Sequence, residues 1–228
     1  MKAPLNEIFE SIQGEGKYVG ARQLFIRLSG CPLSCYYCDT DHREPLFIEV
    51  NGLKYKNPLG ADELADLLFK HFEPGLCHSI AVTGGEPLLY SAFLEALSTE
   101  LKKRGNIRLF LESSAYDPAL VAQVADCFDI MSLDLKDRED FEAHTKSLID
   151  VLKDIDSIWY LKLVVDKESE PLVIKTATLL QGHVDEIWLQ PVDNIFEAEL
   201  IARWQKIFAK HKIEAYFVPQ VHKLLNIL

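Results

Sequence analysis

Short apolar runs alternate with longer amphipathic stretches along most of the chain. The short runs, such as SIAVTG and RLFLES, are almost continuously apolar, which is typical of strands buried on both faces of a parallel sheet. The longer stretches carry apolar residues at helical spacing. This pattern predicts strands at residues 23–28, 79–83, 108–112, 130–135, 158–165, 186–190 and 214–218. It predicts helices at residues 61–72, 91–104, 118–128, 139–155, 171–180 and 198–211.

Repeated strand–helix units predict a parallel sheet with right-handed crossovers. Six such units and a last strand are fewer than the eight of a complete barrel. We therefore expect an α/β protein with a mainly parallel sheet, folded as a partial, modified (βα)6-type barrel in a single domain over residues 1–228. Residues 46–56 depart from this pattern, because Asn51-Gly52 between two alternating runs predicts an inserted hairpin. The pattern leaves open whether the hairpin covers a site.

The acidic composition narrows the classes of partner. The chain has 35 Asp and Glu against 24 Lys and Arg, for a net charge of −11, whereas a nucleic-acid site needs clustered Lys and Arg. The longest apolar runs are too short to span a bilayer, and the first residues lack the apolar core of a signal peptide. We therefore expect a cytoplasmic protein that binds no nucleic acid and no membrane. In that compartment its five cysteines are not a disulfide framework.

Three of these cysteines, Cys31, Cys35 and Cys38, are spaced as Cys-x-x-x-Cys-x-x-Cys. Three thiolates so close together suit three corners of a 4Fe–4S cluster, and no fourth cysteine lies within easy reach along the sequence. One iron would stay open to a small molecule, unlike the clusters of electron-transfer proteins, which four cysteines close. A structural zinc site is the alternative, because His42 lies shortly after Cys38 and would complete a Cys3His set.

Polar motifs follow several of the predicted strands. The cysteine loop follows the strand at 23–28, and residues 83–87 (TGGEP), 112–115 (ESSA) and 132–136 (SLDLK) end or follow three others. Ligands of parallel α/β folds bind at the carboxyl ends of the strands. The adjacent glycines of TGGEP would let the backbone approach a ligand closely. We therefore expect these motifs to meet at one rim of the sheet.

The cysteine motif followed by a strand-end GGEP resembles the radical S-adenosylmethionine superfamily. In that superfamily the open iron chelates the methionine moiety, and one electron cleaves the sulfonium to a 5′-deoxyadenosyl radical that abstracts a hydrogen atom. The resemblance implies a 4Fe–4S cluster held by the three cysteines and S-adenosylmethionine as a second cofactor. It implies no catalytic residue beyond the cluster and this cofactor.

A narrower set of residues resembles the 7-carboxy-7-deazaguanine synthases. The set is residues 12–16 (IQGEG), then Arg27, then the Cys-Asp-Thr sequence at 38–40. This resemblance implies a carbon–nitrogen lyase that contracts the ring of 6-carboxy-5,6,7,8-tetrahydropterin to 7-carboxy-7-deazaguanine and releases ammonia, in queuosine and deazapurine biosynthesis, a tRNA modification pathway. It also implies an electron donor such as a flavodoxin or ferredoxin. It implies a homodimer, with the hairpin or a final helix as candidate interface.

The same resemblance implies a role for individual residues. Substrate contacts are expected at Ile12, Gln13, Gly14, Arg27 and Thr83. Contacts with S-adenosylmethionine are expected at Gly85, Glu86, Ser113, Ser132, Asp134, Lys136 and Gln190. Thr40 is expected to bind Mg²⁺ together with the substrate carboxylate, since Mg²⁺ prefers oxygen ligands. The chemistry suits these types, because an amide can read the donors and acceptors of a pterin and an arginine fork can clamp a carboxylate.

Some of these residues have simpler interpretations. Arg27 would contribute little if it only paired with a surface carboxylate, Gly14 and Gly16 would suit turns, and Thr40 with Asp39 would suit a turn cap. Alanine also stands at position 115, where the family often has glycine, which restricts the backbone there.

A glycyl-radical activating enzyme is a second hypothesis. The IQGEG and CDT sequences, and the lack of a second ferredoxin-like cysteine cluster, argue against it. The C-terminal QVHKLLNIL, with His222, is a candidate for closing over a substrate.

Overall fold

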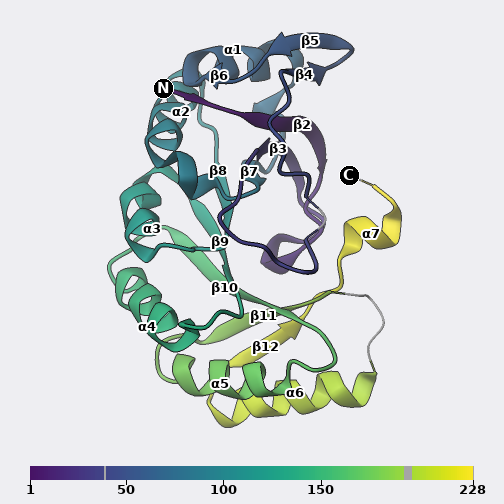
Figure 1. The fold of residues 1–228 in the computed structure, drawn as a ribbon, viewed down its shortest axis with the longest axis vertical. Helices are drawn as coiled ribbons and strands as arrows, with labels where there is room; N and C mark the ends of the chain where they lie inside the picture. Colours follow the sequence, from purple (N-terminus) through teal and green to yellow (C-terminus); the bar gives the residue numbers. More distant parts are fainter. Residues whose placement is uncertain (39, 193–196, 228) are drawn as a thin grey trace.

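The computed structural model describes residues 1–38, 40–192 and 197–227, and within these ranges the chain forms one eight-stranded sheet (Figure 1). The strand order is β12-β11-β10-β9-β8-β7-β3-β2. The strands are β2 (Leu5–Ile12), β3 (Arg22–Leu28), β7 (Ser79–Gly84), β8 (Leu109–Ser113), β9 (Ile130–Leu135), β10 (Ile158–Val165), β11 (Glu186–Pro191) and β12 (Glu214–Phe217). All neighbours are parallel except β2 and β3. β2 and β12 are the two edges, so the barrel is open, as predicted.

Helices cover the outer side of this curved sheet (Figure 1). They are α1 (Ala61–His71), α2 (Ser91–Arg104), α3 (Pro118–Val124), α4 (Phe141–Leu152), α5 (Glu170–Leu180) and α6 (Ala198–Lys210). The long loop after β3 crosses the inner side, and the short helix α7 (Val221–Leu225) lies beside it. No helix in the described ranges is long and apolar enough to cross a membrane.

Most predicted elements are confirmed, with differences at three places. β2 was not predicted, because the apolar residues of its sequence LNEIFESI neither alternate strictly with polar ones nor form a continuous run. The helix predicted at 118–128 ends at Val124 and continues as a 3-10 turn, where Ser98 and Lys102 side chains bind the carbonyls of Cys127 and Asp126. The helix predicted at 139–155 is shorter at both ends.

The inserted hairpin is confirmed as β4 (Phe47–Val50) and β5 (Leu53–Lys56). Asn51 and Gly52 have φ values of 50° and 76°, as a tight hairpin turn between twisted strands requires. β4 packs on β2, and the hairpin lies near α1 at one end of the molecule (Figure 1). A small pair, β1 (Lys2–Ala3) with β6 (Leu59–Gly60), joins the N-terminus to this region.

The sheet separates two apolar layers. The larger lies between the strands and the outer helices. The smaller lies inside the curve and is largely aromatic, with Phe25, Phe110, Tyr160 and Trp188. Side chains alternate between the two faces of a strand. The residue two positions after each of these aromatics therefore also points inward, one step closer to the carboxyl end of its strand. The aromatic layer therefore forms a floor, and the carboxyl ends of the strands are left to form a site above it.

Candidate active site

A cavity lies at the carboxyl ends of the strands, above the aromatic floor. Most residues predicted for a site line it, namely Ile12, Gln13, Gly14, Arg27, Cys31, Cys35, Cys38, Thr40, Thr83, Gly85, Ser113, Asp134, Lys136 and Gln190. Glu86 and Ser132 are buried and are not among the lining residues. None of residues 46–56 lines the cavity, so the hairpin does not cover it.

The cysteine loop forms one part of the wall. The Cys38 N–H donates to the Cys35 carbonyl at 3.1 Å, and burial raises the pKa of the Cys31 thiol. His42 Nε2 lies 3.3 Å from Cys38 Sγ, but no three His, Cys, Asp or Glu residues within the described ranges are gathered as a preformed metal site. Among the described residues neither a Cys3His zinc site nor a cluster site is preformed, so the choice between them rests on the open cavity in front of the thiols. Three thiols on one loop, with a cavity in front of them, suit a cluster with one open iron.

The two glycines of the GGEP turn pack against the base of this loop. A Cβ on Gly84 would lie 2.3 Å from the Leu28 carbonyl oxygen, and one on Gly85 would lie 1.8 Å from the Gly30 carbonyl oxygen. The N–H groups of Gly85 and Glu86 donate to these same carbonyls, at 2.9 and 2.8 Å. The glycines thus allow a close approach of the chain to itself, which fixes the start of the cysteine loop relative to β7.

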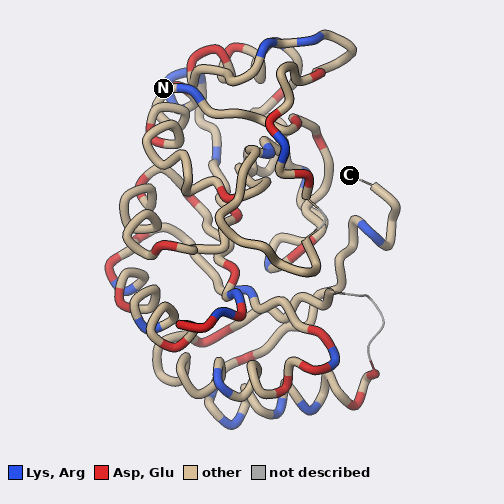
Figure 2. The backbone as a smooth tube through the Cα atoms, viewed as in Figure 1, with Lys and Arg blue, Asp and Glu red and all other residues tan. Residues whose placement is uncertain are grey.

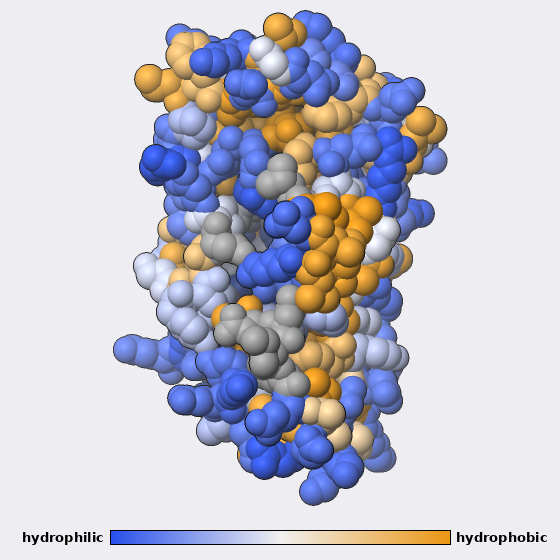
Figure 3. All heavy atoms as spheres, turned by 90° about the vertical axis from the view of Figure 1, so that its right-hand side faces the viewer, coloured by the Kyte–Doolittle hydropathy of each residue, from blue (hydrophilic) through white to orange (hydrophobic). Residues whose placement is uncertain are grey.

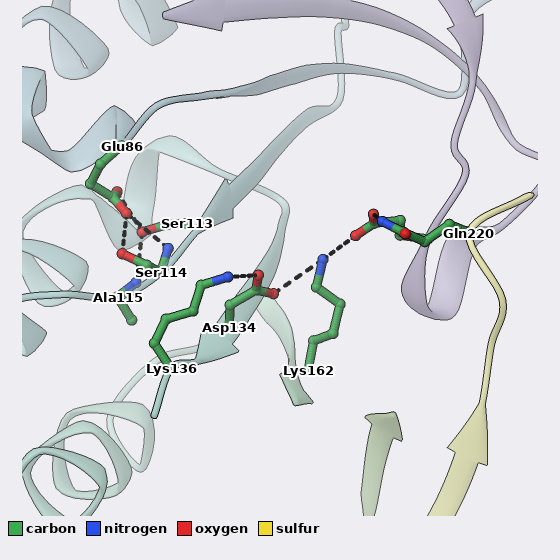
Figure 4. A network of polar contacts seen from close by, with 9 residues as sticks. Glu86, Ser113, Ser114, Ala115, Asp134, Lys136, Lys162 and Gln220 are labelled. Carbon is green, nitrogen blue, oxygen red and sulfur yellow. Dashed lines mark hydrogen bonds and ion pairs between the residues drawn. The ribbon is translucent and has the colours of Figure 1, made fainter. Parts of the chain in front are cut away.

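Glu86 holds the turn after β8 through hydrogen bonds to Ser113 and Ser114 (Figure 4). Its carboxylate accepts hydrogen bonds from the Ser113 hydroxyl at 2.7 Å and from the N–H of Ser114 at 2.8 Å. Burial raises the pKa of Glu86, and these hydrogen bonds partly oppose the shift. Ala115 adopts a left-handed φ of 48°, and His144 donates to its carbonyl at 2.7 Å. Ala115 therefore adopts a conformation that glycine takes up more readily, and Glu86 supports the wall without lining the cavity.

Four charged side chains form a chain of ion pairs across the cavity (Figure 4). Lys136 Nζ lies 2.8 Å from Asp134 Oδ2, and Lys162 Nζ lies 3.1 Å from Asp134 Oδ1. Lys162 also pairs with Glu15, whose other oxygen accepts from Gln220 at 2.8 Å. Burial alone would raise the pKa of Glu15, but the charge of Lys162, the hydrogen bonds from Lys162 and Gln220, and the charge of His222 together outweigh burial and lower this pKa to about 2. Glu15 is therefore an ionised acceptor at the wall.

A second carboxylate, Glu112, faces the same cavity. Burial raises its pKa, Lys162 opposes this shift, and the nearby charge of Glu15 adds to it. Gln13 Nε2 donates to Glu112 and to Gln23, both at 2.9 Å, and the Gln13 side-chain oxygen accepts from the N–H of Glu15. The protein therefore uses both amide hydrogens of Gln13. Gln13 thereby positions Glu112, and the substrate contact expected of Gln13 stays a prediction.

Arg27 fits both interpretations considered from the sequence, a contact with the substrate and an ion pair with a carboxylate. It lines the cavity and also forms an ion pair with Glu7 on β2. Its guanidinium lies 5.1 Å from the centre of the Phe9 ring, which restricts the plane of the fork. A guanidinium has five N–H donors, so the pair with Glu7 leaves donors for a ligand.

The C-terminal segment closes one side of the cavity. The N–H of Val221 donates to the Gly14 carbonyl at 2.9 Å, and Gln220, His222 and Lys223 line the wall. A Cβ on Gly14 would lie 2.1 Å from His222 Nδ1. Gly14 is therefore required by contact with this segment. Gly16 has a φ of 60° and does not line the cavity, in agreement with a turn glycine, and a Cβ there would also lie 2.7 Å from Tyr160 Oη.

Sequence reasoning missed Lys162 as a lining residue, and it gave no individual role to Glu15, Glu112 and Gln220, which lie in the IQGEG, ESSA and QVHKLLNIL segments that it singled out. Lys162 had a signal, because a lysine in the apolar run IWYLKLVV has to be paired if the strand is buried. Gln190 was predicted, and among the described residues neither of its buried side-chain polar atoms has a partner, which suits a residue that binds a ligand. Ser132 lies two residues before Asp134 on β9 and is buried, so it does not line the cavity. Thr40 lines the cavity, while Asp39 lies outside the described residues.

The chain is similar to known proteins over most of its length. A family model described as the radical SAM superfamily matches residues 25–188. The 7-carboxy-7-deazaguanine synthase of Archaeoglobus fulgidus is 33% identical over 240 residues, covering 100% of both chains. That of Thermococcus kodakarensis is 32% identical with 100% of both chains covered, and that of Geobacter sulfurreducens is 30% identical with 98% of this chain and 97% of the other covered. The crystal structure of QueE from Escherichia coli has the same fold, with a TM-score of 0.63 at 22% identity over 97% of this chain and 95% of that chain.

Proposed function

The chain belongs to the radical S-adenosylmethionine superfamily and, within it, to the family of 7-carboxy-7-deazaguanine synthases, and on this premise we propose that it contracts the ring of 6-carboxy-5,6,7,8-tetrahydropterin to 7-carboxy-7-deazaguanine with release of ammonia. Such a carbon–nitrogen lyase serves queuosine biosynthesis, a tRNA modification pathway. Membership of the superfamily implies a 4Fe–4S cluster and S-adenosylmethionine. When bound, these supply a one-electron route to hydrogen-atom abstraction.

The observation that carries the proposal is one cavity lined by both the three thiols and two half-buried carboxylates. Glu15 is held ionised by Lys162, and Glu112 is held by Gln13. A pterin edge carries amino and ring N–H donors, which carboxylates accept. These two groups would bind and orient the heterocycle, while the cysteine loop holds the cofactors at another part of the wall.

The substrate carboxylate would lie at Arg27 and Thr40. The fork of Arg27 suits a carboxylate, because two parallel hydrogen bonds fix both its position and its plane. Thr40 supplies one oxygen ligand, and Mg²⁺ usually keeps several waters. One hydroxyl is a weak site by itself, so we propose that Mg²⁺ binds together with the substrate.

Two protein partners complete the proposal. A small electron-transfer protein such as a flavodoxin or ferredoxin would reduce the cluster. A second copy of the chain would form a homodimer, for which the β4–β5 hairpin and α7 are the candidate interfaces.

The proposed reaction is tested on protein purified without oxygen and reconstituted with iron and sulfide. It is mixed with S-adenosylmethionine, a reductant, Mg²⁺ and 6-carboxy-5,6,7,8-tetrahydropterin, and products are followed by mass spectrometry. We expect 7-carboxy-7-deazaguanine from the wild type. The Cys35→Ala variant should lose both product and most iron. Cys77→Ala is the matched control, since Cys77 does not line the cavity, and should keep both.

Other outcomes would test the proposed substrate and the proposed radical chemistry separately. If 5′-deoxyadenosine formed without any deazaguanine, the substrate would be rejected and the radical chemistry retained. A colourless protein that held zinc and no iron would reject both.

A further inference from the structure

Lys162 carries its ammonium into the cavity from the middle of the sheet. It lies on β10, between Tyr160 in the aromatic floor and Val164 in the cavity wall. Its side chain is 5% exposed. An ammonium buried to this degree is costly unless it is paired and hydrogen-bonded, so its partners define what the residue does.

Two carboxylates from distant parts of the chain share this ammonium. Asp134 is the cross-strand neighbour of Lys162 in the β9–β10 register, and its Oδ1 lies 3.1 Å from Nζ. Glu15 lies 147 positions earlier and accepts from the same Nζ. Figure 4 shows Lys162 with Asp134 on one side. On its other side lies the Glu15 carboxylate, which also accepts from Gln220. Lys162 therefore joins the loop after β2 to the carboxyl end of β9.

Glu15 depends on such a contact because it lies on a loop and not on a strand. One of its oxygens accepts from Gln220 and the other from Lys162. A carboxylate oxygen has two acceptor sites, so each oxygen keeps capacity for a ligand. Gln220 belongs to the C-terminal segment, whereas Lys162 is anchored in a strand with neighbours on both sides. Lys162 is thus the more rigid of the two supports.

We propose that Lys162 is a positioning residue that acts through Glu15: by pairing with Asp134 and Glu15 together, it fixes the Glu15 carboxylate toward the part of the cavity that receives the pterin. This inference rests on the proposed function, since the pterin is the ligand that Glu15 would orient. It predicts that loss of the ammonium weakens pterin binding only while the Glu15 carboxylate is present.

The test is a double-mutant cycle measured by equilibrium binding of 6-carboxy-5,6,7,8-tetrahydropterin to the reconstituted holoenzyme. The variants are Lys162→Met, Glu15→Gln and the two combined. Lys162→Met should raise the pterin Kd by ~10-fold or more, since truncating one partner of a buried charge pair is costly. In the Glu15→Gln background the same substitution should change Kd by less than ~3-fold, because coupled residues are not additive.

Three results would overturn the inference. An unchanged Kd in Lys162→Met would show that Glu15 needs no such support. An equal rise in both backgrounds would show that Lys162 contacts the pterin itself or acts on the whole fold. A wild type that binds S-adenosylmethionine but no pterin would overturn the proposed substrate, and with it this role of Lys162.

Two further variants keep the test independent of folding. Lys146→Met removes an exposed ion pair on α4 and should leave every value unchanged. Lys162→Arg retains a positive charge but changes its reach, so it should fold even if Lys162→Met does not. It should raise Kd several-fold in the wild-type background and not in the Glu15→Gln background, and additive effects would again contradict the inference.

Discussion

Two carboxylic acids of the cavity have opposite electrostatic surroundings. Burial would raise the pKa of Glu15, but the charge and hydrogen bond of Lys162, with the hydrogen bond of Gln220 and the charge of His222, together lower it to about 2. For Glu112, burial prevails over Lys162 and raises the pKa. Carboxylates whose environments move their pKa values apart can take different roles in one site. Glu15 therefore supplies an acceptor throughout the neutral range, whereas Glu112 is the group that more readily keeps a proton.

The low pKa of Glu15 predicts a particular dependence of stability on pH. A folded-state pKa below the ordinary value of 4.5 adds stability that is complete above 4.5 and is lost as the pH falls toward 2. We expect the wild type to exceed Glu15→Gln in unfolding free energy by up to ~3 kcal/mol near neutral pH. The excess should shrink between pH 4.5 and 2.

Urea unfolding of both proteins, purified without iron, measures this difference at each pH. A difference that grew as the pH fell, or that did not vary, would contradict the low pKa. The difference reports the loss of Glu15 together with the effect of its charge on the pKa of Glu112, since every other titrating group is present in both proteins.

At the scale of elements, the site depends on two backbone contacts that only glycine permits. The GGEP turn touches the start of the cysteine loop through Gly84 and Gly85, and the C-terminal segment touches the loop at 13–16 through Gly14. In both places a Cβ would meet other atoms of the chain at less than van der Waals distance. These glycines were expected to admit a ligand or to form turns, and the structure shows that they join elements.

Substitution of Gly14 should therefore release the C-terminal segment. In Gly14→Ala the new Cβ would meet His222 Nδ1 at 2.1 Å, and such overpacking costs ~1–3 kcal/mol. We expect trypsin to cleave after the exposed Lys223 at least ~5-fold faster, the factor that follows from the lower end of this range.

Two variants make this result specific. Gly75→Ala is the control, since a Cβ there meets nothing within 4 Å, and its cleavage rate should equal that of the wild type. Adding His222→Gly to Gly14→Ala should slow cleavage again. Equal cleavage of wild type and Gly14→Ala would mean that the segment is not held by this contact.

At the scale of the whole molecule, exposed apolar side chains gather at two places. One is α7, where Leu224 and Leu225 are 59% and 57% exposed, in the region of the apolar patch on the face shown in Figure 3. The other is the hairpin, with Phe47 and Leu53 exposed. Charges of both signs are interspersed along the outer helices, as Figure 2 shows. The two apolar places are therefore the candidate contacts with a second copy.

The expected homodimer can be assigned to one of these places by sedimentation velocity. The wild type should sediment as a dimer. Either Leu224→Ser with Leu225→Ser or Phe47→Ser with Leu53→Ser should give a monomer, and the pair outside the interface serves as control. A monomeric wild type, or a dimer that survives both pairs, would reject these interfaces.

The sequence by itself determined most of the strands and helices and the open parallel barrel, and most of the site residues that it predicted line the cavity. This was possible because strand and helix periodicities are local, and because the carboxyl ends of parallel strands meet at one edge. Only the tertiary structure decided which polar groups pair. In the folded chain the Gln13 amide bonds to Gln23 and Glu112, and Glu86 is buried behind the cavity lining. Glu15 pairs with Lys162 across 147 positions of sequence. Such pairings depend on the distances and burial that the folded chain creates, and no local pattern contains them.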